Sequence, residues 1–446
     1  MRKIFEKFFE EIEDDRRIAI YEPSSVGFKS ITFGEMRDKV ISNVNYFKGI
    51  GLKPSENVLF LLPLSIDLYV ALLSVIALGG SAIFIEPWIK RDVLKEILKG
   101  INCGYVITNL KGRIFLRKIF KGKFLSIKNK IESGENLLND FSLENPAIIT
   151  FTTGSTGIPK KVVRTFKELL RQIERLSKHI EKGDFIDLVS FPNLVLLNIY
   201  HKTTTVLPVK IIDRRYLNEC MEKLNVSRIF LSPSFLMNSL NIELGRKIKK
   251  IFTGGSIIQA KFIRDFSIED KINIFYGCTQ IEPISVTDGK KFIEWKGKGY
   301  YAGKIEEDLE FKILGDEAGE LLLRFPEEEW VYTDDIVMEK NREIELLGRK
   351  SDVFNINEKI FYPYEIQKYF EETKRLVFPL SYNNKLFLIV EGKMEKNLEE
   401  IILSKFISIY NLKPDIIFLK EIPKDQRHRG KIDSRKLREI ISLRFL

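Results

Sequence analysis

Hydrophobic and polar positions follow two different periods along most of the chain. Short apolar runs such as NVLFLLP (57–63), SAIFIEP (81–87) and AIITFTTG (147–154) have the length and the β-branched content of buried strands. In the segment after Pro159, apolar residues recur at three- and four-residue steps with Lys, Arg and Glu between them, which is typical of an amphipathic helix. The alternation of the two patterns predicts α/β layers around mostly parallel sheets, up to about residue 350.

One apolar run, from Leu68 to Ile85, is long enough to raise the question of a transmembrane helix. The pair Gly79-Gly80 divides it into a half rich in Ala and Leu and a half rich in β-branched residues, each of ordinary core length. We therefore predict a core helix followed by a core strand, and not an integral membrane protein.

Further strand candidates end in Pro or Gly, where loops begin: SRIFLSP (227–233), KIFTGG (250–255) and INIFYG (272–277). Ligands of open α/β sheets gather at such carboxyl ends. GELLLRFP (319–326) opens a stretch that is richer in strands, and it leads to the charged GRKSD (348–352).

The C-terminal quarter has a simpler pattern. A strand candidate at 385–392, a helix from about Leu398 to Ile409 and a strand candidate at 415–423 predict a small α+β unit. The expected organisation is a large N-terminal α/β domain (1–347), a hinge (348–352) and a C-terminal α+β domain (353–446).

Composition narrows the class of protein. Lys and Arg number 72 against 62 Asp and Glu, a net charge of +10 that suits phosphate-bearing ligands or nucleic acid. The basic residues are spread along the chain, so solvated surface explains them and no nucleic-acid partner is expected. The three cysteines are odd in number and widely spaced, and MRKIFEKFFEEIEDD has no apolar signal core. We expect a cytoplasmic protein without disulfides or a zinc site.

FTTGSTGIPKK (151–161) has the composition of a phosphate cradle. Glycines allow successive N–H groups to point into one concavity, while hydroxyls and a lysine add donors and charge. The spacing does not fit a Walker A loop, because Pro159 precedes the lysine and no Ser or Thr follows it. A flexible linker is the alternative, but the buried strand before the motif and the helix after it favour phosphate binding.

The motif is similar to the TSGSTGxPKG loop of adenylate-forming enzymes, the superfamily of acyl-CoA synthetases, peptide synthetase adenylation domains and firefly luciferase, although Lys161 replaces the last Gly. Other segments resemble the family in the same order: FTGGS (252–256), YGCTQIEP (276–283), YTDD (332–335), GRKSDVFNINEKIFYPYEI (348–366) and IPKDQRHRGKIDSRKL (422–437).

The resemblance implies ATP, Mg²⁺ and a carboxylic acid as ligands, and it implies a role for each matching residue. Phosphates of ATP would be held by Thr152, Thr153, Gly154, Ser155, Thr156, Gly157 and Lys160. The adenine side would be formed by Gly254, Gly255, Ser256, Tyr276, Gly277 and Thr279. Asp335 and Arg349 would hold the ribose, Asp352 would be the hinge residue, and Lys431 would be the catalytic lysine on the C-terminal lid.

Two positions depart from the family pattern near the metal. Gln280 replaces a Glu that is often placed near magnesium, and Glu282 is a substitute for it or a surface carboxylate.

His428 lies beside the proposed catalytic lysine, but we interpret it as a solvated loop residue. His179 and His201 form no metal-like cluster with it in sequence, so no structural metal is expected.

Two segments, LPLSIDLYVALLSVIALGGSAIFIEPW (62–88) and PKDQRHRGKID (423–433), are similar to the fatty-acid branch of the family, which includes olefin β-lactone synthetases. Relatives that form thioesters commonly carry glycines where this chain has Asn357 and Glu358, and extra side chains would narrow a tunnel lined by backbone. We therefore expect acyl-adenylate formation to be robust and thioester formation with free coenzyme A to be weak. The opposite interpretation is that Glu358 points into solvent.

Three hypotheses follow. The first is a ligase of the acyl-CoA synthetase type that activates a carboxylic acid, in particular a fatty acid, and transfers it to coenzyme A, a carrier protein or another acceptor. The second is a β-lactone synthetase that acts on a 3-hydroxy acid. The third is a non-catalytic protein that binds nucleotides or nucleic acid, based on the basic excess and on Gln280.

Overall fold

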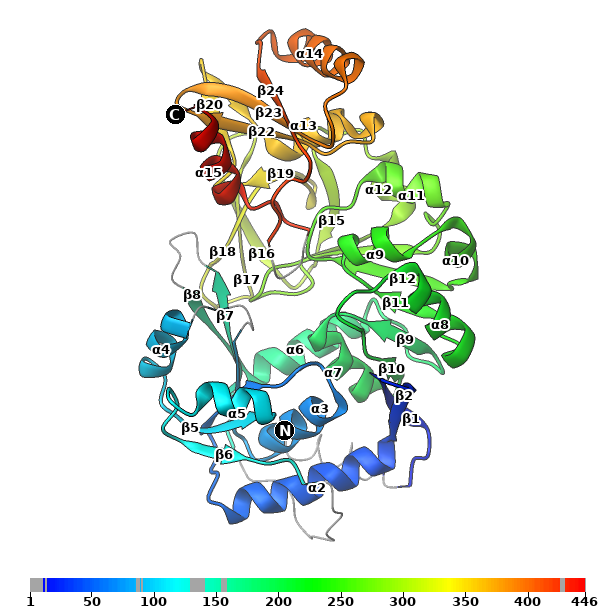
Figure 1. The fold of residues 1–446 in the computed structure, drawn as a ribbon, viewed down its shortest axis with the longest axis vertical. Coiled ribbons are helices and arrows are strands. Elements are labelled where there is room, and N and C mark those ends of the chain that lie inside the picture. Colours follow the sequence, from blue (N-terminus) through cyan, green and yellow to red (C-terminus); the bar gives the residue numbers. More distant parts are fainter. Residues whose placement is uncertain are drawn as a thin grey trace. The chain divides into compact units, whose positions relative to one another are not determined.

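The computed structural model of the protein describes residues 11–12, 14–85, 89, 91–128, 141–153, 159–425 and 430–445 (Figure 1). Its contacts divide the chain into two compact units. Unit 1 comprises Met1–Ile212 and Glu219–Phe230, and unit 2 comprises Asp213–Asn218 and Leu231–Leu446. The boundary between domains at 347–353 that we expect from the sequence lies inside unit 2, and it stays a prediction.

Unit 1 contains two sheets of mainly parallel strands. The first has the order β6-β5-β3-β4-β7-β8, and the second the order β11-β9-β10-β1-β2. The strands of the first are β3 (Asn57–Leu61), β4 (Ser81–Phe84), β5 (Cys103–Thr108), β6 (Lys123–Leu125), β7 (Pro146–Thr153) and β8 (Pro159–Thr165). Those of the second are β1 (Ile18–Ser24), β2 (Gly27–Thr32), β9 (Ile186–Val189), β10 (Thr204–Val206) and β11 (Arg228–Phe230).

Helices connect these strands, as the alternating pattern predicts. They are α2 (Phe33–Gly49), α3 (Ile66–Ala77), α4 (Arg91–Lys99), α5 (Leu110–Leu116), α6 (Phe166–Ser177) and α7 (Pro192–His201). The apolar run from Leu68 to Ile85, for which a transmembrane helix was considered, is confirmed as core. Helix α3 is buried along almost its whole length, Gly79 turns the chain with a φ of 74°, and β4 follows. Among the described residues, no helix is long and apolar enough to cross a membrane.

The segment around the phosphate-loop motif differs in one respect from the expected strand, loop and helix. Lys160 and Lys161 belong to β8, which pairs antiparallel with β7, so that Thr152 lies opposite Lys160. α6 begins only after β8, with Thr165 and Glu168 forming a capping box at its N-terminus. The motif therefore joins two strands of a hairpin, a geometry that also differs from a Walker A loop.

The large sheet of unit 2 has the order β16-β17-β18-β19-β15-β14-β13-β12. Its strands are β12 (Lys250–Gly254), β13 (Ile272–Tyr276), β14 (Ser285–Asp288), β15 (Tyr300–Ile305), β16 (Glu310–Leu314), β17 (Gly319–Arg324), β18 (Val331–Lys340) and β19 (Glu343–Arg349). Only β12 and β13 pair in parallel. The expectation of mostly parallel sheets fails for β14 to β19, which pair antiparallel throughout. The strands from β16 to β19 follow one another through short connections, and short connections join antiparallel neighbours.

Helices α9 (Pro233–Ser239), α10 (Ile242–Lys247), α11 (Ala260–Phe266) and α12 (Gly289–Glu294) accompany this sheet, and α8 (Arg214–Leu224) is divided between the two units. A hydrophobic cluster packs beside the sheet, built on Ile284, Leu321, Leu323, Val337 and Ile344, all of which are fully buried.

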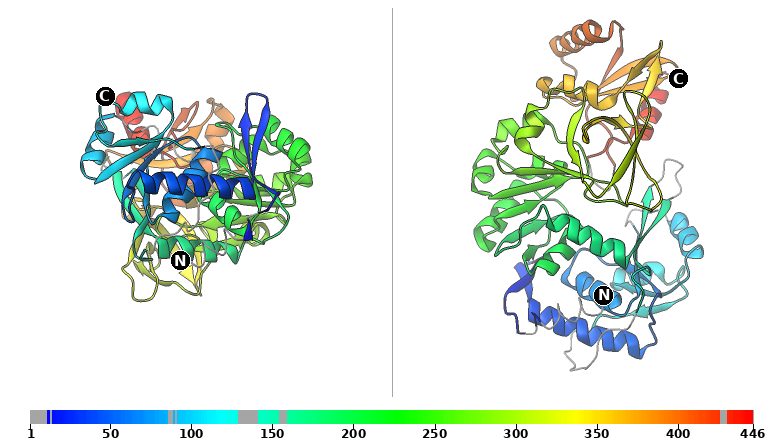
Figure 2. Two further views of the ribbon diagram at one scale, coloured as in Figure 1. Left: turned by 90° about the horizontal axis from the view of Figure 1, so that it is seen from below. Right: turned by 180° about the vertical axis from the view of Figure 1, so that it is seen from behind.

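The last part of unit 2 is a small sheet with helices on both faces. Its strands are β22 (Val377–Tyr382), β23 (Lys385–Glu391) and β24 (Asp415–Leu419), and its helices are α13 (Pro363–Tyr369), α14 (Lys396–Tyr410) and α15 (Ser434–Phe445). Alternate residues of β23 point to opposite sides: Leu388 packs with Phe406 of α14, and Ile389 packs with Leu437 of α15. Figures 1 and 2 show α14 and α15 on opposite sides of this sheet.

These elements confirm the predicted fold class, an α/β protein with large sheets and a small C-terminal α+β part. The expected helix at 398–409 lies within α14, and the strand candidates at 385–392 and 415–423 contain β23 and β24. The three cysteines, all among the described residues, form no disulfide bond.

Candidate functional site

A buried carboxylate is the centre of a pocket in unit 2. Asp335 of β18 lies directly opposite Arg349 of β19 in the antiparallel register, so their side chains share one face of the sheet. The Nε atom of Arg349 lies 3.1 Å from Oδ1 of Asp335. The hydroxyl of Thr333 accepts a hydrogen bond from the backbone N–H of Asp335 and donates one to Leu321, which fixes the strand at this point.

Tyr276, the last residue of β13, holds the other oxygen of the carboxylate. Its hydroxyl donates a hydrogen bond of 2.9 Å to Oδ2 of Asp335, and both side chains are buried. Burial and the neighbouring Asp335 raise the pKa of Tyr276 well above its ordinary value. The phenol therefore stays protonated and remains a donor at neutral pH.

Arg349 keeps its charge in this pocket. Burial is the largest single effect and by itself lowers the pKa of Arg349, but the charge interactions with Asp335, Tyr364, Tyr276 and Asp334 together outweigh it, and the net pKa lies above the ordinary value. Its Nη1 also donates a hydrogen bond of 3.0 Å to the carbonyl of Thr333. Asp335 and Arg349 thus form a fixed pair of opposite charges at the pocket wall.

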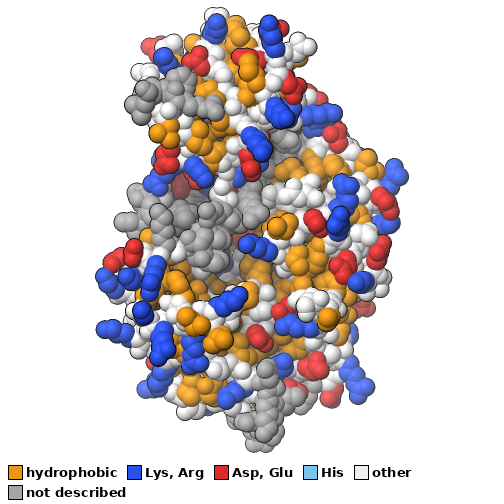
Figure 3. Space-filling model, viewed as in Figure 1, with side chains coloured by type: hydrophobic (Ala, Val, Ile, Leu, Met, Phe, Trp, Pro, Cys, Tyr) orange, Lys and Arg blue, Asp and Glu red, His pale blue; other side chains and the backbone are white. Residues whose placement is uncertain are grey.

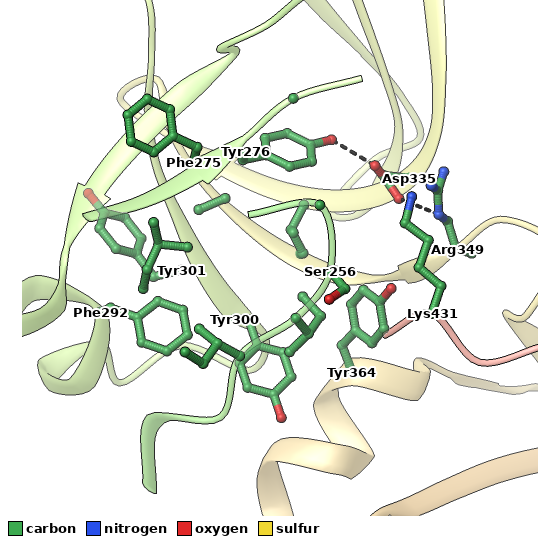
Figure 4. Close-up of a pocket in the computed structure, with 17 residues that line it drawn as sticks. Ser256, Phe275, Tyr276, Phe292, Tyr300, Tyr301, Asp335, Arg349, Tyr364 and Lys431 are labelled. Carbon is green, nitrogen blue, oxygen red and sulfur yellow. Dashed lines mark hydrogen bonds and ion pairs between the residues drawn. The ribbon is translucent and has the colours of Figure 1, made fainter. Parts of the chain in front are cut away.

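Lys431 reaches the same pocket from the C-terminal segment. Its side chain lines the cavity, and in Figure 4 it extends toward Asp335 and Arg349 with Tyr364 beside it. The backbone around it is tied down, because Lys431 N donates to a carboxylate oxygen of Asp425 while Asp425 N donates to the carbonyl of Lys431. These two hydrogen bonds fix the backbone position from which the long, flexible side chain of Lys431 extends.

Seven of the residues expected from the sequence meet at this pocket, although their segments are far apart in the chain. They are Gly255, Ser256, Tyr276, Gly277, Asp335, Arg349 and Lys431. Gly255 has a φ of 82°, a left-handed conformation that favours glycine, and it turns the chain sharply at the end of β12. This turn brings Ser256 and the residues after it along the edge of the cavity.

Aromatic side chains that the sequence analysis did not single out complete the wall. Phe292, Tyr300, Tyr301 and Tyr364 line the pocket with the residues above (Figure 4). Tyr364 belongs to α13, directly after Pro363 at the N-terminus of that helix. The signals that were available are the Tyr pair in GKGYYAG and the Tyr residues of IFYPYEI, but an aromatic residue is usually core.

Other expected residues of unit 2 lie outside the pocket lining. Gly254 ends β12, where a Cβ atom would come within 2.5 Å of the carbonyl of Phe275, so the position has no room for a side chain. Thr279 and Glu282 lie in the loop after β13. Asp352, the expected hinge residue, lies in a turn in which its N–H donates to the carbonyl of Arg349.

The expected phosphate-binding residues belong to unit 1. Thr152 and Thr153 are the end of β7, and Lys160 is an exposed residue of β8. Gly154, Ser155, Thr156 and Gly157 lie outside the described residues, as does His428. The roles of all these residues stay predictions.

The two residues that stand in place of the family glycines form the turn of a short hairpin. Asn357 and Glu358 connect β20 (Phe354–Ile356) with β21 (Lys359–Phe361), and both have positive φ, 51° and 63°. A two-residue hairpin with both central residues left-handed is a type I′ turn, which favours Asn-Gly. The side chain of Glu358 is exposed.

No preformed metal cage accompanies the pocket. Among the described residues, no group of three His, Cys, Asp or Glu side chains is arranged to hold a metal ion. A magnesium ion carried by a nucleotide needs only one or two carboxylates together with the phosphates. Glu282, partly buried and close in sequence to the pocket residue Gly277, is compatible with such a contact.

Comparison with solved structures supports the fold. The amide bond synthetase McbA of Marinactinospora thermotolerans superposes with a TM-score of 0.82, 15% identity and coverage of 99% of both chains. ATP-bound MatB from Rhodopseudomonas palustris gives a TM-score of 0.82 with 14% identity and 98% coverage of both. At this identity, the likeness concerns the fold alone.

The sequence relatives are longer than this chain, and each match covers only part of the relative. Bacitracin synthase 1 of Bacillus licheniformis is 22% identical over 330 residues, which are 66% of this chain but 6% of the synthase. The nonribosomal peptide synthetase GRA1 of Gibberella zeae is 21% identical over 269 residues, 58% of this chain, and the chain spans only 3% of its length. The olefin β-lactone synthetase of Xanthomonas campestris is 26% identical over 196 residues, 40% of this chain and 35% of that enzyme.

A protein family matches most of the chain. The AMP-binding enzyme family matches residues 8–328, which include the phosphate-loop motif and Tyr276 of the pocket. The fold and this match agree, and the match ends before Asp335, Arg349 and Lys431. The chain therefore belongs to the AMP-binding enzyme family.

Proposed function

We propose that the protein activates a carboxylic acid with ATP, forming an acyl-adenylate and releasing pyrophosphate. The observation that carries the proposal is the buried Asp335, held by Tyr276 and Arg349, with Lys431 lining the same pocket. A carboxylate acceptor with fixed donors around it suits the two hydroxyls of a ribose. A mobile ammonium group beside it suits the reacting anions.

The chemistry explains why a cation is needed at this point. A carboxylate is a poor electrophile, and its attack on the α-phosphate of ATP brings two anions together. Fixed positive charge placed where negative charge accumulates lowers this barrier. In our proposal, Lys431 lies between the carboxylate of the substrate and the α-phosphate, while Asp335 and Arg349 hold the ribose.

We assign the remaining ligands of ATP to the other predicted residues. Gly254 to Ser256, Tyr276, Gly277 and Thr279 would surround the adenine. The motif from Thr152 to Lys160 would bind the β- and γ-phosphates, and Glu282 would contact Mg²⁺ that arrives with the nucleotide. Asp352 would be the point about which the C-terminal lid, from residue 353 onward, turns.

Pyrophosphate release tests the proposal directly. The protein is incubated with ATP, Mg²⁺ and a panel of short, long, aromatic and 3-hydroxylated acids, and we expect release with fatty acids. The non-catalytic hypothesis predicts nucleotide binding without release for any acid. Absence of release across the panel, by a protein that binds ATP, would therefore overturn the proposal.

The acyl acceptor is a separate question. The turn at Asn357 and Glu358 supports the proposal that transfer to free coenzyme A is weak, although the exposed side chain of Glu358 equally fits a surface role. A coupled assay compares the wild type with Glu358→Gly, and a carrier protein or an amine replaces coenzyme A in parallel. Rapid acyl-CoA formation that is unchanged in Glu358→Gly would assign the protein to the ordinary acyl-CoA synthetases.

A second candidate function has a specific observation in its favour, the 26% identity to an olefin β-lactone synthetase over 196 residues. In that reaction, the 3-hydroxyl of the substrate attacks the activated carbonyl and AMP leaves. Product mass analysis with a 3-hydroxy acid distinguishes the two functions, because the β-lactone has the mass of the acid less one water and needs no external acceptor.

A further inference from the structure

The segment after β5 carries an unusual combination of exposed apolar and basic side chains. α5 begins at Leu110, and Leu116 anchors it in the core beneath β5. On the outer side, Leu110, Ile114 and Phe115 have exposed fractions of 74%, 69% and 44%. Leu110 and Ile114 are four residues apart, so they lie on the same face of the helix.

Cations surround these apolar residues. The exposed basic side chains of the segment are Lys111, Arg113, Arg117, Lys118, Lys121 and Lys123. No Asp or Glu occurs between Leu110 and Lys128. Among the described residues, Lys111, Arg117, Lys118 and Lys121 have no ion-pair partner, whereas the lysines of the preceding helix α4 pair with Asp92 and Glu96. Figure 3 shows basic and hydrophobic side chains together over α5.

We propose that the α5 patch, defined as residues 110–123, is a docking surface for an anionic membrane. Bulky apolar side chains that are exposed on a helix can insert between lipid headgroups, and the exposed lysines and arginines of the same segment are complementary to anionic phosphates. An acidic protein or a nucleic acid would satisfy the cations but would leave the protruding Leu110 and Ile114 without apolar partners. The proposal concerns a surface of unit 1 and stands whether or not the proposed function is right.

The attachment is peripheral and reversible. Among the described residues there is no helix able to span a bilayer. The patch is short, with one face of two helical turns and its flanking cations. Each cation near an anionic surface contributes about 5-fold in affinity. Binding should therefore require anionic lipid and weaken as salt screens the charges.

Flotation with vesicles tests the proposal on the whole chain of 446 residues. Wild type is mixed with vesicles of phosphatidylcholine alone or of phosphatidylcholine with phosphatidylglycerol, in about 0.1 M salt, a concentration that leaves a Debye length of about 10 Å. We expect it to float only with the anionic vesicles. We expect the double variant Lys118→Glu/Lys121→Glu to lose at least about 25-fold in affinity. Leu110→Ser/Ile114→Ser should lose about 10-fold or more at unchanged net charge.

Two matched controls separate the patch from general effects. Lys385→Glu/Lys413→Glu makes the same change of net charge at exposed lysines of unit 2, and Val26→Ser removes a single side chain with an exposed fraction of 95%. Both should bind vesicles as the wild type does. Thermal unfolding followed by circular dichroism should show that all variants are folded.

The proposal is overturned if the wild type fails to float with anionic vesicles, or if the patch variants and the controls bind equally. Poly-L-glutamate and a DNA duplex serve as soluble polyanions in the same set. Binding of either one that depends on Lys118 and Lys121 but is unchanged in Leu110→Ser/Ile114→Ser, without vesicle binding, would instead identify a macromolecular polyanion as the partner.

Discussion

Lys431 and Lys424 lie on the same C-terminal segment, but only Lys431 lines the pocket beside Asp335 and Arg349. Lys424 pairs instead with Glu391, at 3.3 Å. The two lysines carry the same charge and lie seven residues apart in the sequence. Comparing their substitutions therefore tests whether the position of Lys431 at the pocket matters.

We expect Lys431→Ala to lower pyrophosphate release about 10²–10³-fold, because a charge-stabilising donor aimed at the reacting atoms is removed. ATP binding should be largely kept, since Asp335 and Arg349 are unchanged. The measurements are initial rates and equilibrium binding of ATP. Lys424→Ala should retain nearly the full rate, and equal rates for the wild type and Lys431→Ala would remove the assigned role.

His201 is a buried histidine outside the pocket, at the end of α7. Its Nε2 lies 2.7 Å from the hydroxyl of Ser177, which donates its own proton to the carbonyl of Ile173. Nε2 therefore carries the ring proton of the neutral form. Nδ1 is buried, and it has no hydrogen-bond partner among the described residues. Burial, together with the charges of Lys182 and Arg228, lowers the pKa of His201 to about 4.

The lowered pKa predicts a pH dependence of stability. Between about pH 6.5 and pH 4, the unfolded chain binds a proton at this histidine and the folded chain does not, so stability falls as the pH falls through this window. The free energy of unfolding should drop by about 2 kcal/mol more in wild type than in His201→Gln between pH 7.5 and pH 5. Urea unfolding at both pH values measures this, and equal drops in the two proteins would contradict the prediction.

Contacts between elements hold α13 and the segment after it against the large sheet of unit 2. The ammonium group of Lys368 donates to the carbonyls of Trp295, Gly297 and Gly299, at 3.3, 2.7 and 2.8 Å. Three residues later, the buried carboxylate of Glu371 accepts from the backbone N–H groups of Ala260 and Lys261 at the start of α11. The same C-terminal part of the chain carries Lys431.

Lys368→Met should therefore weaken the positioning of Lys431 as well as the fold. Loss of a charged donor to three carbonyls is expected to lower the free energy of unfolding by about 2 kcal/mol. It should also reduce the rate of pyrophosphate release while ATP binding changes little. Lys405→Met is the matched control, because Lys405 is partly buried like Lys368 but donates to a single carbonyl, that of Tyr369. If the two variants had equal stability and equal rates, the contact would have no such role.

The elements were easier to predict from the sequence than the pocket. Strands such as β12, β13 and β23 are short apolar runs ended by Gly or Pro, and burial of such runs leaves little choice of structure. β8 was missed because its sequence PKKVVRT is basic and its partner is a hairpin neighbour. The residues of β8 also lie partly within the phosphate-loop motif, and they show no alternation of apolar and polar positions that would have predicted a strand.

The pocket depended on a resemblance rather than on a pattern. Asp335 and Arg349 are adjacent because of the register in which β18 and β19 pair. The local sequences YTDD and GRKSD do not predict that register. Tyr300, Tyr301 and Tyr364 were missed since aromatic residues at the end of a strand or helix are usually core. Their meeting at one cavity depends on contacts between segments far apart in the chain.

At the level of the whole molecule, the two units divide the expected chemistry between them. Every residue that lines the pocket, from Gly255 to Lys431, belongs to unit 2, whereas the phosphate-loop motif belongs to unit 1. A ligand that uses the pocket alone should thus stabilise unit 2 first. In our proposal AMP is such a ligand, because it has the adenine, the ribose and one phosphate but lacks the β- and γ-phosphates.

We expect AMP at 100 times its dissociation constant to add about 3 kcal/mol to the stability of the unit that binds it. This corresponds to a rise in Tm of about 6 °C if unit 2 unfolds by itself and of about 3 °C if the whole chain unfolds cooperatively. Of the three tryptophans, Trp295 and Trp330 lie in unit 2 and Trp88 lies in unit 1, so in a Trp88→Phe background tryptophan fluorescence follows the unfolding of unit 2 while calorimetry follows the chain. Asp335→Asn removes the carboxylate that we propose binds the ribose, and it should lose most of the shift. A shift that is absent from the tryptophan signal, or undiminished in Asp335→Asn, would place nucleotide binding elsewhere than in this pocket.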